Sequence, residues 1–323
     1  MEFKGYTFGY GAKPGTFKSD EGKKSMDACM ALGLNWICIP VPVDEETYSS
    51  TEITFDYKRN LSYKDVMFAV QRAHENGVRV CLKPMVNCKD GAWRASIDFP
   101  DGDMVGRDVF WEKWFESYNA FMLYYAEMAE DTGCEMLCIG CEMLGTERKT
   151  DYWRKLINKI RKVYHGKLVY NTNHGSEDKV EWFDALDYIG TSAYYRVGTP
   201  EGSSASEMKA AWKKVAAELS IISKRFNKKI IFMEIGCRSA KGLASMPWDF
   251  AHKELPFDED EQAAFYESVL DVMKDEKWFD GFFWWDWSAK IYDDREAAQK
   301  DQGFNIHLKK AEQVLKKYYA LIK

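Results

Sequence analysis

Short apolar runs alternate with amphipathic stretches along the whole chain. Eight runs have the length of buried strands, and they cover residues 6–11, 36–43, 79–86, 136–142, 167–173, 188–195, 229–236 and 281–287. Stretches with helical periodicity follow them, near residues 21–32, 62–76, 109–132, 150–164, 177–185, 206–227, 258–275 and 309–322. The runs are apolar almost throughout, which is typical of a parallel sheet buried on both faces.

Eight strands that alternate with helices predict the fold class α/β, as a single (β/α)8 TIM barrel; a doubly wound sheet is the main alternative. No repeat, low-complexity tract or linker interrupts the pattern, so we predict one catalytic domain over residues 1–323. The long segments 87–107 and 237–257 each follow a strand. We therefore expect them at the C-terminal face, where barrel enzymes carry their active sites.

Composition narrows the classes of function. The net charge of −6 over 323 residues argues against a nucleic-acid-binding protein, which would carry an excess of basic residues. No apolar run is long enough to span a membrane. The start of the chain lacks an apolar signal segment, so we expect a cytoplasmic protein unless a signal was removed. With 12 Trp and 18 Tyr, the chain is rich in rings that suit sugar faces, although an aromatic core gives the same count.

Two apolar runs carry a carboxylate at or near their end. Glu142 closes the fourth run and Glu234 lies in the seventh. A carboxylate in such a setting is costly unless it is paired or used. The ends of strands four and seven lie on opposite sides of a barrel mouth, so the two side chains can face each other across a substrate. Glycosidic cleavage needs such a pair, whereas two structural ion pairs are the alternative.

The last strand carries three tryptophans, Trp284, Trp285 and Trp287, with Asp286 among them. Alternation along a strand points Trp285 and Trp287 one way and Trp284 the other. A bulge at the strand end would bring Trp284 and Trp287 to the same site. We expect one Trp to stack on a sugar ring, and at least one to pack between barrel and helices.

Polar side chains at other strand ends are candidates for substrate binding. Tyr194 or Tyr195, at the end of the sixth strand, can hydrogen-bond the nucleophile on the seventh, while the other Tyr caps the barrel rim. Five further residues lie at or after strand ends: Tyr10, Lys83, Asn87, Trp93 and Asn173. Lys83 in Cys-Leu-Lys-Pro either contacts a polar substrate or pairs with a neighbouring acid. Asn173 either binds hydroxyls or caps the following helix.

One motif suggests a different class of enzyme. Cys134, Cys138 and Cys141 have the spacing of a radical S-adenosylmethionine iron–sulfur motif. They fall along a predicted strand, where Cys138 and Cys141 should point to opposite faces, so this remains a remote alternative. The five His show no metal-ligand spacing, and no phosphate loop follows a strand. We therefore predict no metal and no cofactor.

The chain resembles glycoside hydrolase family 113, a clan A family of β-mannan-degrading barrels. The motifs that carry the resemblance lie on the third to eighth strands, and they are Leu82-Lys-Pro84, Cys138-Ile-Gly-Cys-Glu142, Ala185-Leu-Asp-Tyr-Ile-Gly190, Ala193-Tyr-Tyr195, Phe232-Met-Glu-Ile-Gly236 and Phe283-Trp-Trp-Asp-Trp287. The paired Glu motifs are shared by all of clan A. The Cys-Ile-Gly-x-Glu form and the Trp-Trp-x-Trp ending are typical of this family.

The resemblance implies that Glu142 is the acid/base and Glu234 the nucleophile of a retaining hydrolase of β-1,4-mannosidic linkages. It implies a sugar-stacking Trp at Trp284 or Trp287, and Tyr194 or Tyr195 beside the nucleophile. It also implies an oligosaccharide or polysaccharide as partner; oligomeric state stays open. Another clan A β-glycosidase (β-glucosidase, β-xylosidase or β-galactosidase) is the alternative. Most of clan A has Asn where Cys141 precedes the acid/base, so we expect an altered hydroxyl contact there. Action at the ends of imported oligosaccharides is a further hypothesis, based on segments 87–107 and 237–257.

Overall fold

A computed structural model describes residues 1–102 and 105–321. Within these residues eight parallel strands form a closed barrel, because β1 pairs with both β9 and β2. The strands are β1 (Phe3–Phe8), β2 (Trp36–Glu45), β4 (Arg79–Cys88), β5 (Met136–Cys141), β6 (Lys167–Asn173), β7 (Tyr188–Ser192), β8 (Ile230–Ile235) and β9 (Phe279–Trp287). A two-residue strand, β3 (Ile53–Thr54), adds to β2 in the antiparallel direction. The predicted (β/α)8 barrel is thus confirmed.

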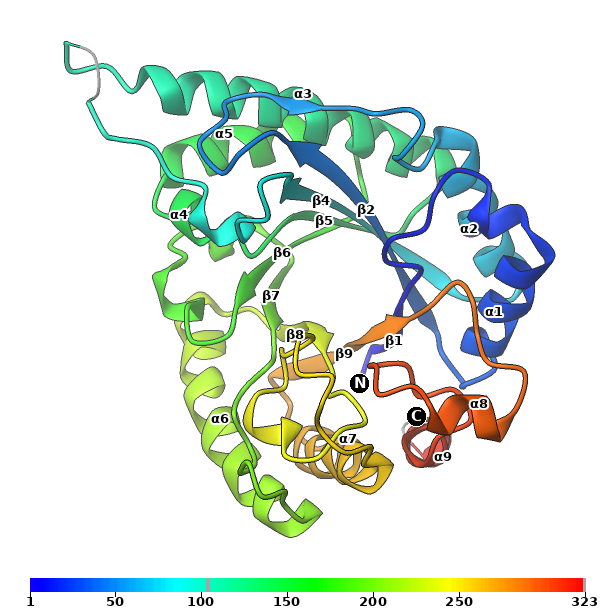
Figure 1. Ribbon diagram of the computed structural model, residues 1–323. Helices are drawn as coiled ribbons and strands as arrows, with labels where there is room; N and C mark the ends of the chain where they lie inside the picture. The colour runs from blue at the N-terminus through cyan, green and yellow to red at the C-terminus, as the bar shows by residue number, and fades with distance from the viewer. Residues whose placement is uncertain (103–104, 322–323) are drawn as a thin grey trace.

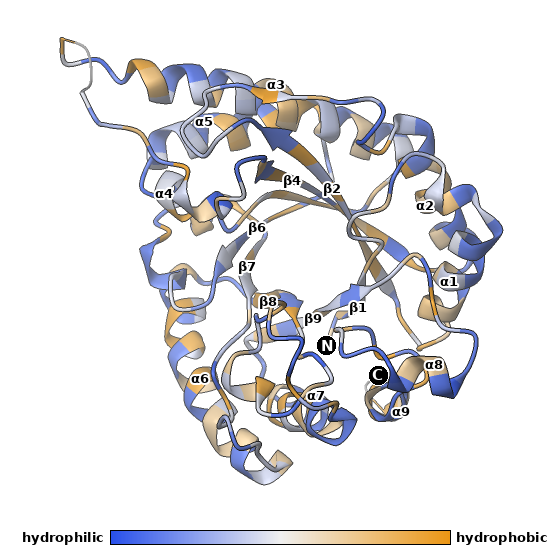
Figure 2. Ribbon diagram, in the orientation of Figure 1, coloured by the Kyte–Doolittle hydropathy of each residue, from blue (hydrophilic) through white to orange (hydrophobic). Residues whose placement is uncertain are grey.

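Helices surround the strands, as the view down the barrel in Figure 1 shows. They are α1 (Asp20–Met30), α2 (Tyr63–Glu75), α3 (Val109–Thr132), α4 (Leu144–Glu147), α5 (Thr150–Ile160), α6 (Ala205–Phe226), α7 (Glu259–Met273), α8 (Arg295–Gln299) and α9 (Lys310–Leu321). In Figure 2 the surrounding helices carry orange and blue residues together, as amphipathic helices do. None of the described helices is long and apolar enough to cross a membrane.

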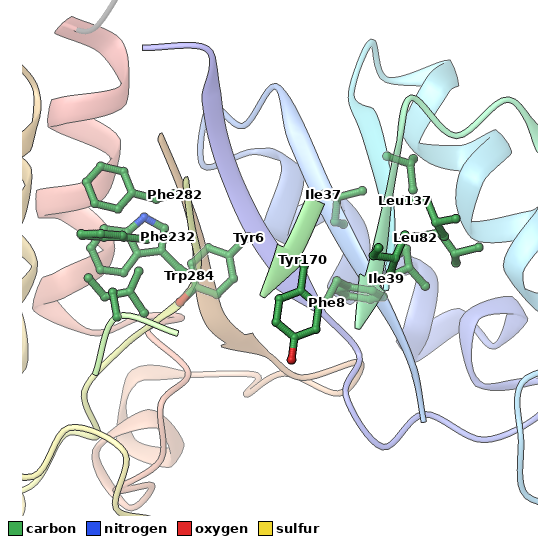
Figure 3. Close-up of a cluster of buried hydrophobic side chains, with 14 of the residues drawn as sticks. Tyr6, Phe8, Ile37, Ile39, Leu82, Leu137, Tyr170, Phe232, Phe282 and Trp284 are labelled. Atoms are coloured by element: carbon green, nitrogen blue, oxygen red, sulfur yellow. The ribbon is translucent and has the colours of Figure 1, made fainter. Parts of the chain in front are cut away.

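Two hydrophobic clusters divide the core. The smaller one fills the inside of the barrel with ten side chains, namely Phe3, Trp36, Cys38, Cys81, Met136, Cys138, Val169, Ile231, Met233 and Phe283. The larger one lies between strands and helices and includes the side chains labelled in Figure 3, such as Leu82, Phe232 and Trp284. A strand residue therefore belongs to one of two environments, and its cluster tells which way its side chain points.

The structure differs from the predicted elements in a few places. The first strand ends at Phe8 rather than residue 11, because Gly9 and Gly11 adopt φ values of 76° and 80° outside the strand region. The helix predicted over residues 177–185 is wrong. In its place are two short 3-10 helices, since buried Glu177 accepts a hydrogen bond from Thr191 of β7 at 2.6 Å and ties the segment to the barrel.

Candidate active site

Glu142 reaches the barrel mouth through an irregular end of β5. Between Cys138 and Cys141, β5 holds one more residue than its neighbour β6, so a bulge interrupts the alternation of side chains. Cys138 belongs to the cluster inside the barrel, and the Cys141 thiol also points inward. Glu142 follows with a φ of 52°, a left-handed value that is strained for a side chain other than glycine. The bulge and this turn direct its carboxylate into the mouth.

A second bulge, on β8, directs the Glu234 side chain into the barrel mouth. Between Phe232 and Ile235, β8 holds one more residue than β9. Phe232 and Ile235 pack outside the barrel and Met233 packs inside, which leaves the extra residue, Glu234, also facing inward. A regular strand would have turned this carboxylate toward the helices.

Glu234 is the centre of a dense set of donors. Its Oε1 atom accepts from Lys83 Nζ at 2.5 Å, from Asn171 Nδ2 at 3.4 Å and from the Cys141 thiol at 3.4 Å. Its Oε2 atom accepts from the Tyr194 hydroxyl at 3.1 Å. An ionised carboxylate is a pure acceptor, and this arrangement of donors matches that form.

Lys83 is fully buried, and its only charged partner among the described residues is Glu234. Burial lowers the pKa of Lys83, but the neighbouring Cys141 and Glu234 side chains outweigh it, and the net direction is upward. Lys83 is therefore an ammonium. Of its two predicted roles the structure shows the ion pair, and the acid it pairs with is the predicted nucleophile.

Glu142 has a different environment. Its Oε2 atom accepts from Trp93 Nε1 at 3.1 Å and from Arg94 Nη1 at 3.1 Å. Burial and then the charge of Glu234 raise its pKa, while Arg94, Ser192 and Trp93 act in the opposite direction; the net result is a raised pKa. One carboxyl with a raised pKa beside one held by an ammonium is the division of labour that acid–base chemistry needs.

The two carboxyls belong to one hydrogen-bonded set. Asn171 Nδ2, which donates to Glu234, also lies 3.1 Å from Ser192 Oγ. Ser192 in turn contacts Glu142. Glu142 and Glu234 are both largely buried, with 8% and 5% of their surfaces exposed, so they share a small, partly desolvated space at the mouth.

Two polar residues in this set were not predicted. Asn171 and Ser192 lie near the ends of β6 and β7, and their inward direction follows from pairing, since Asn171 lies beside Cys141. Sequence reasoning selected Asn173 instead. Asn173 lies at the rim, where its Nδ2 atom makes a long 3.5 Å contact with the His174 carbonyl and touches neither carboxylate.

The prediction that Trp284 or Trp287 stacks on a sugar is wrong. Both rings are fully buried outside the barrel. Trp284 donates to the Tyr319 hydroxyl at 2.9 Å, and Figure 3 shows its ring beside Phe232 and Phe282. Trp287 donates to Ser25 Oγ at 3.1 Å. Neither ring can reach a substrate at the mouth.

Trp285 takes the place predicted for its neighbours. Its ring centroid lies 4.8 Å from that of Tyr10, which is 38% exposed, and Lys83 Nζ lies 6.0 Å from its centre. Trp285 itself is partly exposed. The predicted residue Tyr10 thus lies beside the site, and it forms with Trp285 an aromatic surface next to the Lys83–Glu234 pair.

The side chains of the two tyrosines after β7 point to opposite sides of the barrel wall. Tyr194 donates to Glu234, as predicted for one member of the pair. Tyr195 turns outward, where its hydroxyl bonds to Glu177 and its ring packs on Trp212 with centroids 6.0 Å apart. Tyr195 therefore does not belong to the site.

The loop after β4 supplies Trp93 and Arg94, of which only Trp93 was predicted. Trp93 is 48% exposed at the mouth. Arg94 is held by Val86, whose carbonyl accepts from Nε at 2.9 Å, and by Asn87, whose Oδ1 accepts from Nη2 at 2.6 Å. Asn87 was predicted to bind substrate, and in the structure it positions Arg94.

The three cysteines of the iron–sulfur motif do not gather. Cys134 lies before β5 beside Thr132, whereas Cys138 and Cys141 both point into the barrel. The expectation that these two thiols face opposite sides was wrong, because the bulge in β5 inserts a residue between them. Within the described ranges no group of His, Cys, Asp and Glu could hold a metal ion. Cys141 is 1% exposed and its thiol faces Glu234.

Comparison with known proteins agrees with this geometry. The model of Glycoside Hydrolase Family 113 matches residues 6–309. The comparison with curated proteins found no match. Among solved structures, a family 113 β-mannanase from Alicyclobacillus acidocaldarius, in complex with ManMIm, is 37% identical, with a TM-score of 0.91 and coverage of 100% of this chain and 99% of that one.

A second solved structure, described as a family 113 β-1,4-mannanase complex, is 34% identical with a TM-score of 0.90, and 99% of each chain is covered. A β-glucuronidase from Faecalibacterium prausnitzii shares the fold at 15% identity and a TM-score of 0.65, over 100% of this chain and 49% of its own. The family model matches most of the chain, and the matched region includes both glutamates at the barrel mouth. The chain therefore belongs to glycoside hydrolase family 113.

Proposed function

We propose that this protein is a retaining glycoside hydrolase that cleaves β-1,4-mannosidic linkages, with residues 1–323 as one catalytic domain. The observation that carries the proposal is the contrast between the two buried carboxyls, since Glu234 has an ammonium and three further donors while Glu142 has a raised pKa. The preference for mannosides is supported by the β-mannanases that this chain resembles.

The reaction is a double displacement. A carboxylate oxygen of Glu234 forms a bond to the anomeric carbon while the glycosidic bond breaks, and Glu142 gives its proton to the departing oxygen. Glu142 then removes a proton from water, the water oxygen attacks the anomeric carbon, and Glu234 leaves as a carboxylate. Lys83 and Tyr194 hold Glu234 in place through both steps. Retention requires a carboxyl separation of about 5–5.5 Å.

Trp285 and Tyr10 offer an aromatic surface for the sugar that reacts, and Trp93 offers a second exposed ring beside the acid/base. Both positions suit neutral sugars, whose ring faces are apolar. The proposed partner is thus an oligosaccharide or polysaccharide.

The proposal extends to action at chain ends. Residues 89–102 follow β4 and residues 237–257 follow β8, and Figure 1 shows these loops at the barrel opening. Loops of this length shorten a cleft and favour oligosaccharides over internal sites of a polymer. A cytoplasmic location would suit short imported substrates, and cell fractionation tests it.

A substrate screen is the direct test. We expect hydrolysis of manno-oligosaccharides and of aryl β-mannosides, and proton NMR should show the β-anomer as the first product. Mannohexaose should lose single units from one end. Faster cleavage of aryl β-glucosides, xylosides or galactosides would assign another clan A activity. The α-anomer as first product would contradict retention, and random internal cuts would contradict action at chain ends.

Variants separate the two glutamates. Glu234→Gln should abolish turnover of every substrate, because no nucleophile remains. Glu142→Ala should keep activity only on substrates with activated leaving groups, and azide should accelerate it by attacking the glycosyl-enzyme. A β-mannosyl azide product identifies Glu142 as the acid/base. An Glu142→Ala enzyme that azide does not rescue would contradict that role.

A further inference from the structure

The two oxygens of the Glu142 carboxyl have unequal surroundings. Trp93 Nε1 and Arg94 Nη1 both donate to Oε2, each at 3.1 Å. No N–H group of the described residues donates to Oε1. The remaining polar contact of the carboxyl is the Ser192 hydroxyl, which can accept a hydrogen bond as well as donate one.

Arg94 is a fixed donor. Its Nε atom donates to the Val86 carbonyl at 2.9 Å, and its Nη2 atom donates to Asn87 Oδ1 at 2.6 Å. Only 12% of its side chain is exposed. A guanidinium with three of its donor atoms engaged in a rigid fork cannot follow a carboxylate that rotates. The carboxylate must instead adapt to Arg94.

The backbone of Glu142 adds a second constraint, because its φ of 52° leaves the side chain little choice of direction. Charged and titratable groups approach the carboxyl from several elements. They are Arg94 from the loop after β4, Cys141 from β5, Tyr194 from the loop after β7 and Glu234 from β8, with Lys83 of β4 bound to Glu234 and Tyr10 close to Arg94. Arg94 is the cation in direct contact with Glu142.

We propose that Trp93 and Arg94 clamp Oε2 of Glu142, so that Oε1 is the atom that holds the catalytic proton and passes it to the leaving oxygen. This inference rests on the proposed role of Glu142 as acid/base. A proton on Oε2 would point at two N–H groups, whereas a proton on Oε1 costs neither hydrogen bond. Trp93 and Arg94 act through Glu142, and are positioning residues.

The clamp also sets when Glu142 is protonated. Burial and Glu234 favour the neutral form, and Arg94 favours the charged form. Removing the Arg94 charge should therefore keep Glu142 protonated to higher pH, which moves the basic limb of the kcat/KM profile upward. An adjacent opposite charge shifts a carboxyl by about 1–3 units, so we expect a shift of roughly one unit or more.

The experiment compares Arg94→Met, Arg94→Lys and Trp93→Phe with the parent enzyme. Each is assayed across pH on mannotriose, whose leaving group needs a proton, and on 2,4-dinitrophenyl β-mannoside, whose leaving group does not. General acid catalysis contributes about 100–10,000-fold, so we expect Arg94→Met, which displaces the donor without removing it, to lose about 10–100-fold in kcat/KM on mannotriose and roughly threefold or less on the aryl mannoside. Arg94→Lys should restore the basic limb, because it keeps the charge. Trp93→Phe should give a smaller upward shift.

Arg148→Met is the matched control. It removes the same charge from an arginine that binds Asp98 and Asp101 of the same loop and does not touch Glu142. Its basic limb should coincide with that of the parent. An unmoved limb in folded Arg94→Met, or an equal loss on both substrates, would overturn the clamp.

Two further measurements keep the outcome decisive. If Arg94→Met does not fold, the pH profile of Trp93→Phe tests the clamp instead. A basic limb of kcat/KM that does not move in Trp93→Phe would then overturn the inference. A titration of 13C-labelled glutamate, assigned with Glu142→Gln, follows the same shift without turnover. If the enzyme hydrolyses no β-mannoside, the proposed function is overturned. The titration of Glu142 still tests the clamp in that case, because it needs no turnover.

Discussion

Tyr194 and Tyr195 are neighbours in the chain, yet their hydroxyls bind different carboxylates on opposite sides of the barrel wall. Tyr194→Phe removes a donor from Glu234, and a hydrogen bond to a charged group contributes about 1.5–3 kcal/mol, so we expect kcat to fall by roughly 10–100-fold. Tyr195→Phe removes a hydroxyl of the same kind from Glu177 and should leave kcat within about twofold, because Glu177 lies outside the site. Steady-state kinetics of both variants on one aryl mannoside checks this. Equal losses in the two would refute the assignment of Tyr194.

Trp284 and Trp285 are also neighbours in the chain whose side chains lie in different environments, one buried outside the barrel and one at its mouth. Trp285→Ala removes the ring beside Tyr10, so we expect weaker substrate binding, seen as a higher KM, with little loss of stability. Trp284→Ala empties a fully buried site, and such truncations cost about 3–5 kcal/mol of unfolding free energy. Urea denaturation measures the second effect and kinetics the first. A stable Trp284→Ala with raised KM would reverse the two roles.

Sequence reasoning found the two glutamates because a carboxylate in an apolar strand is conspicuous. Tyr194 was reached through its position next to strand seven. Arg94 gave no such signal, since an arginine in a long loop resembles any solvated charge, and its burial follows only from how the loop folds over β4. Asn171 could have been found by pairing β6 with β5, where it lies beside Cys141.

At the scale of elements, hydrophobic runs and helical periodicity predicted the barrel, because both depend on local patterns that a parallel sheet requires. The bulges of β5 and β8 could not be predicted. Each adds one residue to a strand and reverses the faces of those that follow it, so strict alternation misplaced Cys138 relative to Cys141. The choice among the tryptophans of β9 failed for a related reason. The expected bulge is present, because β9 holds one more residue than β1 between Trp284 and Trp287, but it turns both of these rings outward.

Gly140 lies within the bulge of β5. A Cβ atom there would lie 2.7 Å from the Tyr170 ring, 2.9 Å from Met143 Cε and 3.0 Å from the Tyr118 hydroxyl, so neighbours would have to move. We expect Gly140→Ala to lose about 1–3 kcal/mol of stability, the usual range for overpacking. It should also lower kcat, because displacing the bulge moves Glu142. Thermal unfolding and kinetics on one sample test both; unchanged values for both would show that the bulge tolerates a side chain.

At the scale of the whole molecule, buried carboxyl groups determine how stability depends on pH. Burial raises the pKa of Glu45 and of Glu147 to about 7 in each case. An unfolded Glu titrates near 4.3, so the folded state holds more protons between about pH 4.3 and 7. The stability from these groups is fully present below the unfolded pKa and is lost as pH rises toward 7. Glu312, with its pKa lowered to about 2, acts the other way, but only below roughly pH 4.

We therefore predict that the melting temperature rises as pH falls from 8 to about 5. The buried His174 opposes this trend, because burial lowers its pKa. Glu45 and Glu147 each contribute on the order of 2–3 kcal/mol to the free energy of unfolding across that range. Glu45→Gln, which keeps the acceptor beside Trp114, should flatten the profile and raise stability at pH 8. Scanning calorimetry at several pH values tests this, and a melting temperature that falls on acidification would contradict it.

The buried contact between Lys83 and Glu234 has a consequence for the middle of the catalytic cycle. When Glu234 becomes an ester of the sugar, it loses its negative charge, and the fully buried Lys83 loses its counter-ion. An uncompensated charge in the interior is expensive. The unpaired charge therefore destabilises the covalent intermediate, and any attack that frees Glu234 as a carboxylate, by water or by another sugar hydroxyl, restores the ion pair.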